Sequence, residues 1–256
     1  MTVLELLIKY NTCVEEIPVP FEIEDFFEIT INGTIEIKKN NFMSLGRFLR
    51  QHYGKYLTLG LITHICEYFN SLTTVDNKDF KIVSGNDIYK YYYWGNYHDV
   101  TGSLGSSCMR HIDKQPFFKL YVDHAKMLVL FSNDDGRIMG RAILWPYGDT
   151  FLVDRMYTTD RSYEYAFKTY AMRNNFLIRA TNSAIQSGHI VLWLTPKDNY
   201  KQPQLIDYRI KLDKTYSSYP YVDSVCYIST NKRHLSTIPY KGGLILHSTE
   251  GYIRHC

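Results

Sequence analysis

The chain of 256 residues is long enough to bury a substantial core, as one large domain or as a small domain joined to a medium one. Its apolar content of 45% is ordinary for a globular protein, and no window reaches the roughly 18 apolar residues that a membrane span requires. A net charge of +3 is too small for a dedicated nucleic-acid-binding protein, which usually presents a strongly basic face.

Cysteine usage indicates a reducing compartment. The cysteines are odd in number and widely spaced, which disfavours a disulfide framework: Cys13, Cys66, Cys108, Cys226 and Cys256. No CxxC pair is present, and the terminal Cys256 near His247 and His255 cannot alone complete a four-ligand zinc site, so we expect no metal and no cofactor. The N-terminus lacks the regions of a signal peptide, and we therefore expect a soluble cytoplasmic protein.

The first hundred residues are predicted to form a hairpin followed by helices. Residues 21–39 alternate in polarity across Asn32 and Gly33, a pattern typical of two antiparallel strands joined by a tight turn. Apolar residues then recur at spacings of three and four, which predicts two amphipathic helices. Their buried faces are expected to contain Leu45, Phe48, Leu49, Tyr53 and Tyr56, then Leu59, Ile62, Ile65, Cys66 and Phe69.

From Met127 onward the pattern predicts a three-stranded antiparallel meander, formed by MLVLF, RIMGRAILW and FLVDRMY. A helix is expected to begin at Thr159 or Asp160, either of which can cap it. Its inner face should hold Tyr163, Ala166, Phe167, Tyr170 and Ala171.

Further strands are predicted in HIVLWLT, LIDYRIKLD, YVDSVCYIS and GGLILHS. These elements indicate an α+β protein with two parts. Residues 1–100 would form the hairpin and helical region. Residues 101–256 would form a domain whose mixed, largely antiparallel sheet continues through the C-terminal strands.

Cys108 is the first candidate for chemistry, because it follows the small, flexible run GSLGSS, which could bring backbone donors close to a reacting carbonyl. As a nucleophile it would need a base, His111 or His124, and an orienting carboxylate, Asp113 or Asp123. The alternative is a structural thiol, which is the commoner role of cysteine.

Charged residues within the predicted strands form the second candidate site. Arg141 and the adjacent Asp154 and Arg155 alternate with apolar residues, so some of them should point inward and need partners. One interpretation is a buried Arg–Asp network between neighbouring strands. The other is recognition of a phosphate or carboxylate by Arg110, Arg141 and Arg155 together. Asp223 would either cap a turn or complete this cluster.

Four motifs occur in the order SCM, GRAILW, DRMY and YPYVDS, between Gly102 and Val225. In this order they resemble an uncharacterised family of tailed-phage proteins. The resemblance implies a phage-encoded protein of the host cytoplasm, with the virion as an alternative location, and implies no particular activity.

The predicted order of meander, helix and strand resembles a degenerate core of the GNAT-type acetyltransferases. That family carries an R/Q-x-x-G-x-G/A run at the strand-to-helix junction, where backbone N–H groups close on the CoA pyrophosphate. The junction here, residues 158–164, contains no glycine, and Asp160 adds negative charge. We therefore expect no tight binding of acetyl-CoA.

The sequence thus favours an accessory protein that binds a host or viral target, or a small anionic ligand, through the face around Cys108. An acyl- or group-transfer enzyme is one alternative. A nucleic-acid-associated or virion-internal structural protein is the other. The 23 tyrosines fit an AT-rich coding sequence, or stacking platforms for bases or partners.

Overall fold

The computed structural model describes residues 3, 5–7, 10, 34–38, 41–74, 79–180, 192–198, 200, 202–220, 222–241, 243–246 and 253–255. The chain forms two compact units, residues 1–76 and 77–256. This division precedes β3 (Phe80–Ser84), whereas the sequence placed it after residue 100. The difference arises because β3 pairs along its whole length with β4 (Lys126–Phe131) and so belongs to the second unit.

Among the described residues of the first unit, a two-stranded sheet is followed by two helices. These elements are β1 (Thr34–Lys38), β2 (Asn41–Ser44), α2 (Leu45–Tyr53) and α3 (Leu59–Thr74). The predicted apolar faces of both helices are confirmed for most residues, but Tyr56 and Leu59 are exposed because they lie at the connection between the helices. The predicted turn at Asn32 and Gly33, and the strand before it, lie outside the described residues.

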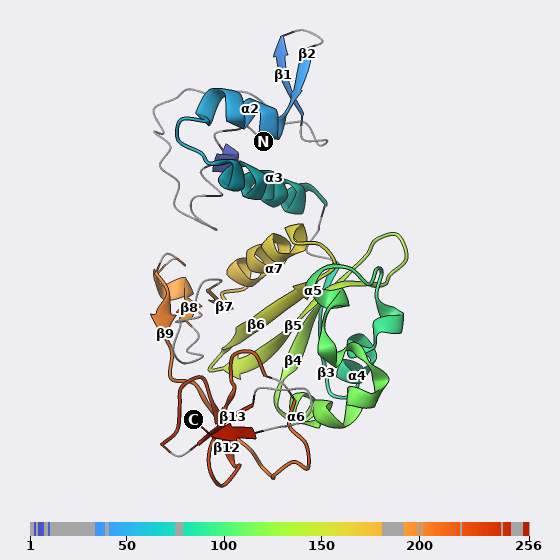
Figure 1. Ribbon diagram of the computed structural model, residues 1–256, viewed down its shortest axis with the longest axis vertical. Coiled ribbons are helices and arrows are strands. Elements are labelled where there is room, and N and C mark those ends of the chain that lie inside the picture. Colours follow the sequence, from blue (N-terminus) through green and yellow to red (C-terminus); the bar gives the residue numbers. More distant parts are fainter. Residues whose placement is uncertain are drawn as a thin grey trace. The chain divides into compact units, whose positions relative to one another are not determined.

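A seven-stranded sheet in the order β3-β4-β5-β6-β7-β8-β9 forms the frame of the second unit (Figure 1). Neighbouring strands are antiparallel except β6 and β7, which run parallel. The strands after β4 are β5 (Ile138–Tyr147), β6 (Thr150–Thr158), β7 (Leu177–Arg179), β8 (Leu192–Leu194) and β9 (Gln204–Leu205). The short helix η5 (Pro196–Asp198) lies between β8 and β9 in the sequence. The predicted meander is confirmed as β4, β5 and β6.

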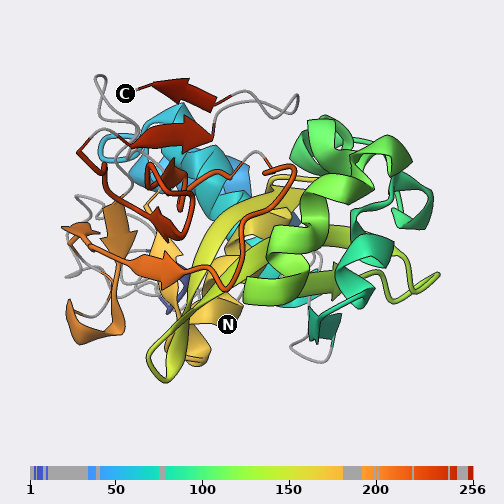
Figure 2. The same ribbon diagram turned by 90° about the horizontal axis from the view of Figure 1, so that it is seen from below.

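Short helices cover one face of this sheet, and we call residues 87–124 the helical layer. Figure 2 shows these green helices gathered at one side of the strands. They are α4 (Asp87–Tyr92), η2 (Trp94–Asn96), α5 (Gly102–Gly105), η3 (Cys108–Arg110), η4 (Ile112–Phe118) and α6 (Lys119–His124). Their buried side chains share one hydrophobic core with the facing residues of β4 and β5, including Met127, Val129 and Trp145.

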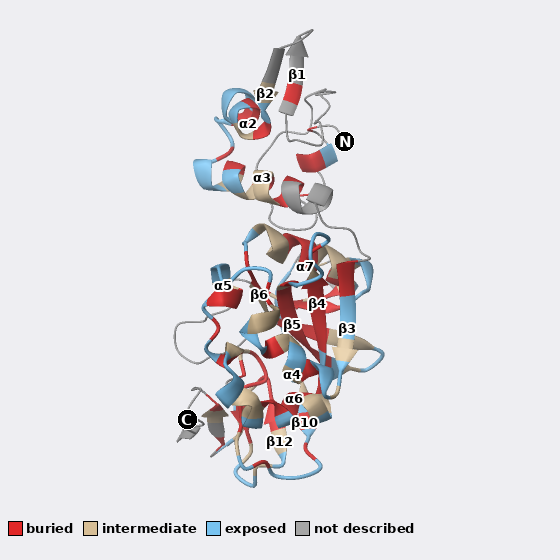
Figure 3. Ribbon diagram, turned by 90° about the vertical axis from the view of Figure 1, so that its right-hand side faces the viewer, coloured by how far each residue is buried: buried red, intermediate tan, exposed pale blue. Residues whose placement is uncertain are grey.

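The opposite face of the sheet is covered by α7 (Ser162–Arg173), which connects β6 to β7. Phe167 of α7 meets Phe80 of β3 edge to face, with ring centres 5.0 Å apart. Ala166, Phe167 and Ala171 are buried as predicted, while Tyr163 and Tyr170 are half-buried. Because both faces are covered, β4 and β5 are buried along most of their length, as Figure 3 shows, while the edge strand β3 remains largely exposed.

The C-terminal strands differ from the prediction, because they form a separate five-stranded sheet in the order β10-β12-β11-β13-β14 and do not extend the main sheet. They are β10 (Arg209–Lys211), β11 (Tyr227–Ile228), β12 (His234–Ser236), β13 (Leu244–Leu246) and β14 (Ile253–His255). Residues 222–226, which were predicted as strand and include Asp223, have no regular structure. No helix among the described residues combines the length and apolar character needed to cross a bilayer.

The GSLG run forms α5, which packs directly on the end of β6. Gly102 has a φ of +59°, and a Cβ built there would lie only 2.4 Å from the carbonyl oxygen of Thr158. Ser103 Oγ accepts a hydrogen bond from the backbone N–H of Thr158 at 2.9 Å. The small residues of this motif therefore allow close approach of two backbones.

Gly102→Ala is expected to lower the free energy of unfolding by about 3 kcal/mol, because alanine is strained at this φ and its methyl group collides with β6. Urea unfolding measures the change. Gly85→Ala is the matched control, since Gly85 also has a φ of +59° but an added Cβ there would meet nothing within 4 Å. The control should lose about 1 kcal/mol. Equal losses in the two variants would contradict close packing of α5 on β6.

Candidate functional site

The four sequence motifs converge on one small cavity inside the second unit. Ser107 and Met109 of the SCM motif, Arg141, Asp154 and Asp223 all line it. Tyr92, Tyr121 and Tyr157 add phenol rings to the wall. The cavity has a volume of about 10 Å³, which has room for about one water molecule and not for a substrate.

Arg141 lies at the centre of this cluster and is almost completely buried. Its guanidinium carbon is 3.8 Å from the ring centre of Tyr92 and 5.0 Å from that of Tyr157. Nη2 donates to Ser107 Oγ at 2.9 Å and to the hydroxyl of Tyr97 at 3.3 Å. Within the described ranges no carboxylate lies within 4.0 Å of it, so rings and hydroxyls hold this charge.

Asp154 is the second buried charge and is held chiefly by neutral donors. Its carboxylate accepts from the indole N–H of Trp145 at 2.9 Å, from the backbone N–H of Arg155 at 2.7 Å and from the hydroxyl of Ser224. The guanidinium of Arg179 is 4.0 Å away. The arginine nearest to Asp154 is therefore Arg179, which the sequence did not assign to the site, and Arg141 forms no ion pair with Asp154 within 4.0 Å.

Asp223 completes the polar interior. The hydroxyl of Tyr157 donates to it at 2.7 Å, and Arg155 Nη1 approaches it at 3.5 Å. Burial, together with the nearby charge of Asp154, raises the pKa of the Asp223 carboxyl. The hydrogen bond from Tyr157 and the charges of Arg179 and Arg155 oppose this rise. Asp223 thus joins the cluster as the sequence suggested, from an irregular segment and not from a strand.

A β-bulge in β6 lies at the adjacent Asp154 and Arg155. These two residues lie opposite the single residue Ile143 of β5, between the pairs Ala142–Met156 and Leu144–Val153. Both line the closed cavity, where Asp154 is buried and half of the Arg155 side chain is exposed.

The bulge also borders a cleft of about 240 Å³ between β6, α7 and β7. Parallel pairing of β6 with β7 ends at Val153 and Ile178, and the cleft lies where the strands stop pairing. Arg155, Lys168 and Arg179 line it together with two acidic residues, Asp154 and Glu164.

The amides at the start of α7 already have an anionic partner in the chain. One carboxylate oxygen of Asp160 accepts from the backbone N–H of Ser162 at 2.8 Å and from its hydroxyl at 2.7 Å. The negative charge of this carboxylate would repel a pyrophosphate at the same helix end.

Cys108 is exposed at the outer side of the cluster, although its neighbours Ser107 and Met109 are buried. Burial of part of the side chain raises the pKa of the thiol, and Asp223 raises it further. His111 is also exposed, and its Nε2 lies 3.4 Å from Nε of Arg110, which does not line the cavity. In the part of the chain that the structure describes, Cys108 has no hydrogen bond to a histidine.

The other proposed members of a cysteine site are engaged elsewhere. Asp113 pairs with Lys114 at 3.1 Å, and Asp123 with Lys119 and Lys214 at 2.9 and 2.8 Å. His124 meets the ring of Tyr216, and burial lowers the pKa of its imidazole.

No group of three or more potential metal ligands occurs among the described residues. Cys13, His247 and Cys256, and the side chain of His255, lie outside them.

The residues that the sequence did not assign to the site are mainly aromatic. Tyr92 and Tyr97 come from the tyrosine-rich segment IYKYYYWGNY. Ile88 and Tyr92, four residues apart and both buried, are the signal for the inner face of α4. The contacts of Tyr92 and Tyr97 with Arg141 depend on how this segment packs on β5 and have no local signal.

A scan against protein-family models, a search of the curated proteins and a search of the solved structures each gave no match. The function of the chain is therefore inferred from its own residues.

Asp154→Ala is expected to lower the free energy of unfolding by about 3 kcal/mol, because it leaves the buried Trp145 N–H and Ser224 hydroxyl without their acceptor. Urea unfolding at neutral pH measures this. Asp149→Ala, an exposed change in the β5–β6 turn, is the control and should stay within about 0.5 kcal/mol of the wild type. An unchanged midpoint for Asp154→Ala would show that Asp154 does not stabilise the fold.

Iodoacetamide at neutral pH is expected to label Cys108 before Cys66, and Cys226 last. Cys108 is exposed, Cys66 is half-buried with its pKa raised to about 11 by burial and by Glu67, and Cys226 is buried. Peptide mass spectrometry resolves each site separately. If Cys108 is labelled only after unfolding, it is a packed structural thiol, and a nucleophilic role is untenable.

Proposed function

We propose that this chain is a binding protein whose protein target docks on the helical layer around Cys108. The observation that carries the proposal is the contrast between a closed interior and an apolar surface. The cavity beneath Cys108 admits no substrate, while Tyr93, Trp94, Val100 and Ile112 expose large apolar side chains from the same layer. Aromatic and aliphatic side chains of this kind are the usual anchors of protein interfaces.

We further propose a phage-encoded protein that acts in the host cytoplasm, so that the target is a host or viral protein. The support is the resemblance of the four motifs to the tailed-phage family. Those motifs line one cavity in the second unit, which gives them a common structural role in supporting the helical layer.

Binding of a small anion in the cleft beside the bulge is the second candidate. Three cationic side chains and two carboxylates line this cleft, and Arg179 approaches Asp154 at 4.0 Å, longer than a charge-assisted hydrogen bond. A phosphate or carboxylate entering the cleft could accept two parallel hydrogen bonds from this guanidinium.

Acyl or group transfer has less support. A GNAT-like core would agree with the order of β4, β5, β6, α7 and β7, but Asp160 occupies the place of the pyrophosphate at α7. The raised pKa of the Cys108 thiol also disfavours the thiolate that nucleophilic catalysis needs.

The proposal is tested by capture from host cells, with and without infection, on immobilised full-length protein. Trp94→Ser combined with Ile112→Ser should abolish capture of the target, because both anchors of the interface become polar. Cys108→Ala should retain capture. With the purified target, the double variant is expected to raise Kd at least about tenfold.

Leu205→Ser is the matched control, since Leu205 is an exposed apolar residue of the same unit outside the helical layer. It should bind as the wild type does, and circular dichroism should confirm that all variants are folded. Capture of the same proteins by wild type and double variant, or no specific capture at all, would refute docking on this layer.

A further inference from the structure

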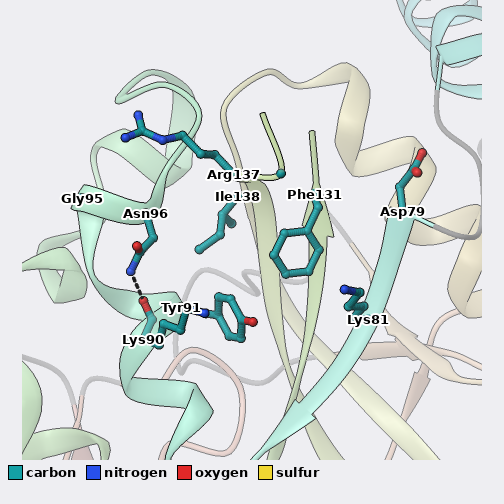
Figure 4. A pocket seen from close by; sticks show the side chains of 10 residues that line it. Asp79, Lys81, Lys90, Tyr91, Gly95, Asn96, Phe131, Arg137 and Ile138 are labelled. Carbon is teal, nitrogen blue, oxygen red and sulfur yellow. Dashed lines mark hydrogen bonds between the residues drawn. The ribbon is translucent and has the colours of Figure 1, made fainter. Parts of the chain in front are cut away.

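A further opening lies beside α4. It has a volume of about 500 Å³ and is bounded by the edge strand β3, the β4–β5 connection and the α4–η2 segment. Tyr92 of α4 lines the closed cavity, whereas the preceding Tyr91 lines this groove. Figure 4 shows Lys81 on one side, Phe131 in the middle, and Lys90, Tyr91 and Asn96 on the opposite side. We call this opening the β3 groove.

Three cations surround the β3 groove without carboxylate partners. Lys81, Lys90 and Arg137 are exposed, and within the described ranges none of them has a carboxylate within 4.0 Å. The acidic residue in the lining is Asp79, which is buried and accepts a hydrogen bond from Asn133 at 3.1 Å. The groove therefore has a positive potential although the chain as a whole is nearly balanced.

Two aromatic rings lie directly among these charges. Tyr91 and Phe131 meet edge to face, with ring centres 5.5 Å apart, and each is half-buried, so part of each ring remains exposed. The ammonium groups of Lys81 and Lys90 lie 5.2 Å from the ring centres of Phe131 and Tyr91, respectively. A ligand that carries a flat ring and an anion would contact a ring and a cation at the same time.

The wall of the groove is already fixed by hydrogen bonds. The Asn96 amide donates to the carbonyl of Lys90 at 2.7 Å and ties η2 to α4, while Arg137 donates to the carbonyl of Tyr97 at 3.5 Å. The backbone that carries Lys90 and Tyr91, and the Arg137 side chain, are thus held in place before a ligand arrives, which reduces the entropy lost on binding.

We propose that the β3 groove binds a nucleotide unit, with its base against Phe131 and Tyr91 and its phosphate between Lys81, Lys90 and Arg137. A volume of about 500 Å³ suits one such unit. The unit can belong to a free nucleotide or to single-stranded nucleic acid, since both offer the same ring and phosphate. The groove shares the α4–η2 segment with the helical layer. Its test leaves Trp94 and Ile112 unchanged, so the two proposals can fail separately.

The experiment uses the full chain at low salt with three probes: adenosine monophosphate by calorimetry, a fluorescent oligothymidylate by anisotropy, and inorganic phosphate as competitor. Lys81→Gln combined with Lys90→Gln should weaken nucleotide binding about tenfold, since two phosphate contacts are lost. Phe131→Leu, which keeps apolar volume but removes the ring, should weaken it about fivefold. Binding of the monophosphate alone supports a free nucleotide, and binding of the oligonucleotide supports a nucleic-acid strand.

Lys197→Gln combined with Lys211→Gln is the matched control, because it removes the same charge from two exposed lysines outside the groove. It should change affinity less than twofold or so. The proposal is overturned if neither nucleotide probe binds, or if the control weakens binding as much as the groove variant. It is also overturned if phosphate competes as well as the nucleotide while Phe131→Leu has no effect, because the groove then recognises only an anion.

Discussion

The buried guanidinium of Arg141 is the constraint on which the second unit depends. A full charge in a protein interior carries a desolvation penalty of roughly several kcal/mol unless nearby groups compensate for it. Here the compensation comes from the rings of Tyr92 and Tyr157 and from the hydroxyls of Tyr97 and Ser107. These partners lie on separate segments before β4 and on β6. Satisfying one charge on β5 therefore requires the helical layer to sit on the sheet in one arrangement.

The buried carboxylates, like Arg141, are stabilised chiefly by uncharged partners. Asp154 is satisfied by an indole, a hydroxyl and an amide, and Asp223 by a phenol, so neither depends on a fully buried ion pair. The arginines that approach them, Arg155 and Arg179, reach outward into the cleft. The buried charged groups consequently have their partners within the chain. We therefore expect other molecules to bind at the surfaces that this interior supports.

The sequence predicted the meander and α7 well, because their patterns are local. MLVLF in β4 is a short continuous apolar run followed by a turn signal, which is the pattern of a strand covered on both faces. Which sheet the C-terminal strands join could not be predicted in this way. Strands of two or three residues, such as β11, carry too little pattern to choose between two sheets.

For the candidate site, the sequence identified the charged residues but not their partners. The prediction that some of the strand charges point inward is confirmed for Arg141 and Asp154, which are buried. Arg141 does not pair with a carboxylate as expected, because tyrosines from distant segments surround its guanidinium. The bulge that places Asp154 and Arg155 together opposite Ile143 arises from the register of β5 with β6 and leaves no mark in the sequence.

That bulge makes β6 sensitive to chain length as well as to side-chain identity. Residues on either side of it are in register with β5 only because two residues of β6 are accommodated opposite one. Deletion of one residue there would exchange the inward and outward positions from Met156 to Thr158, so that Tyr157 would no longer face Arg141. The exposed turns at 133–136 and 148–149 carry no such register. Insertions and deletions compatible with this fold therefore belong in those turns, and β6 can diverge only by substitution.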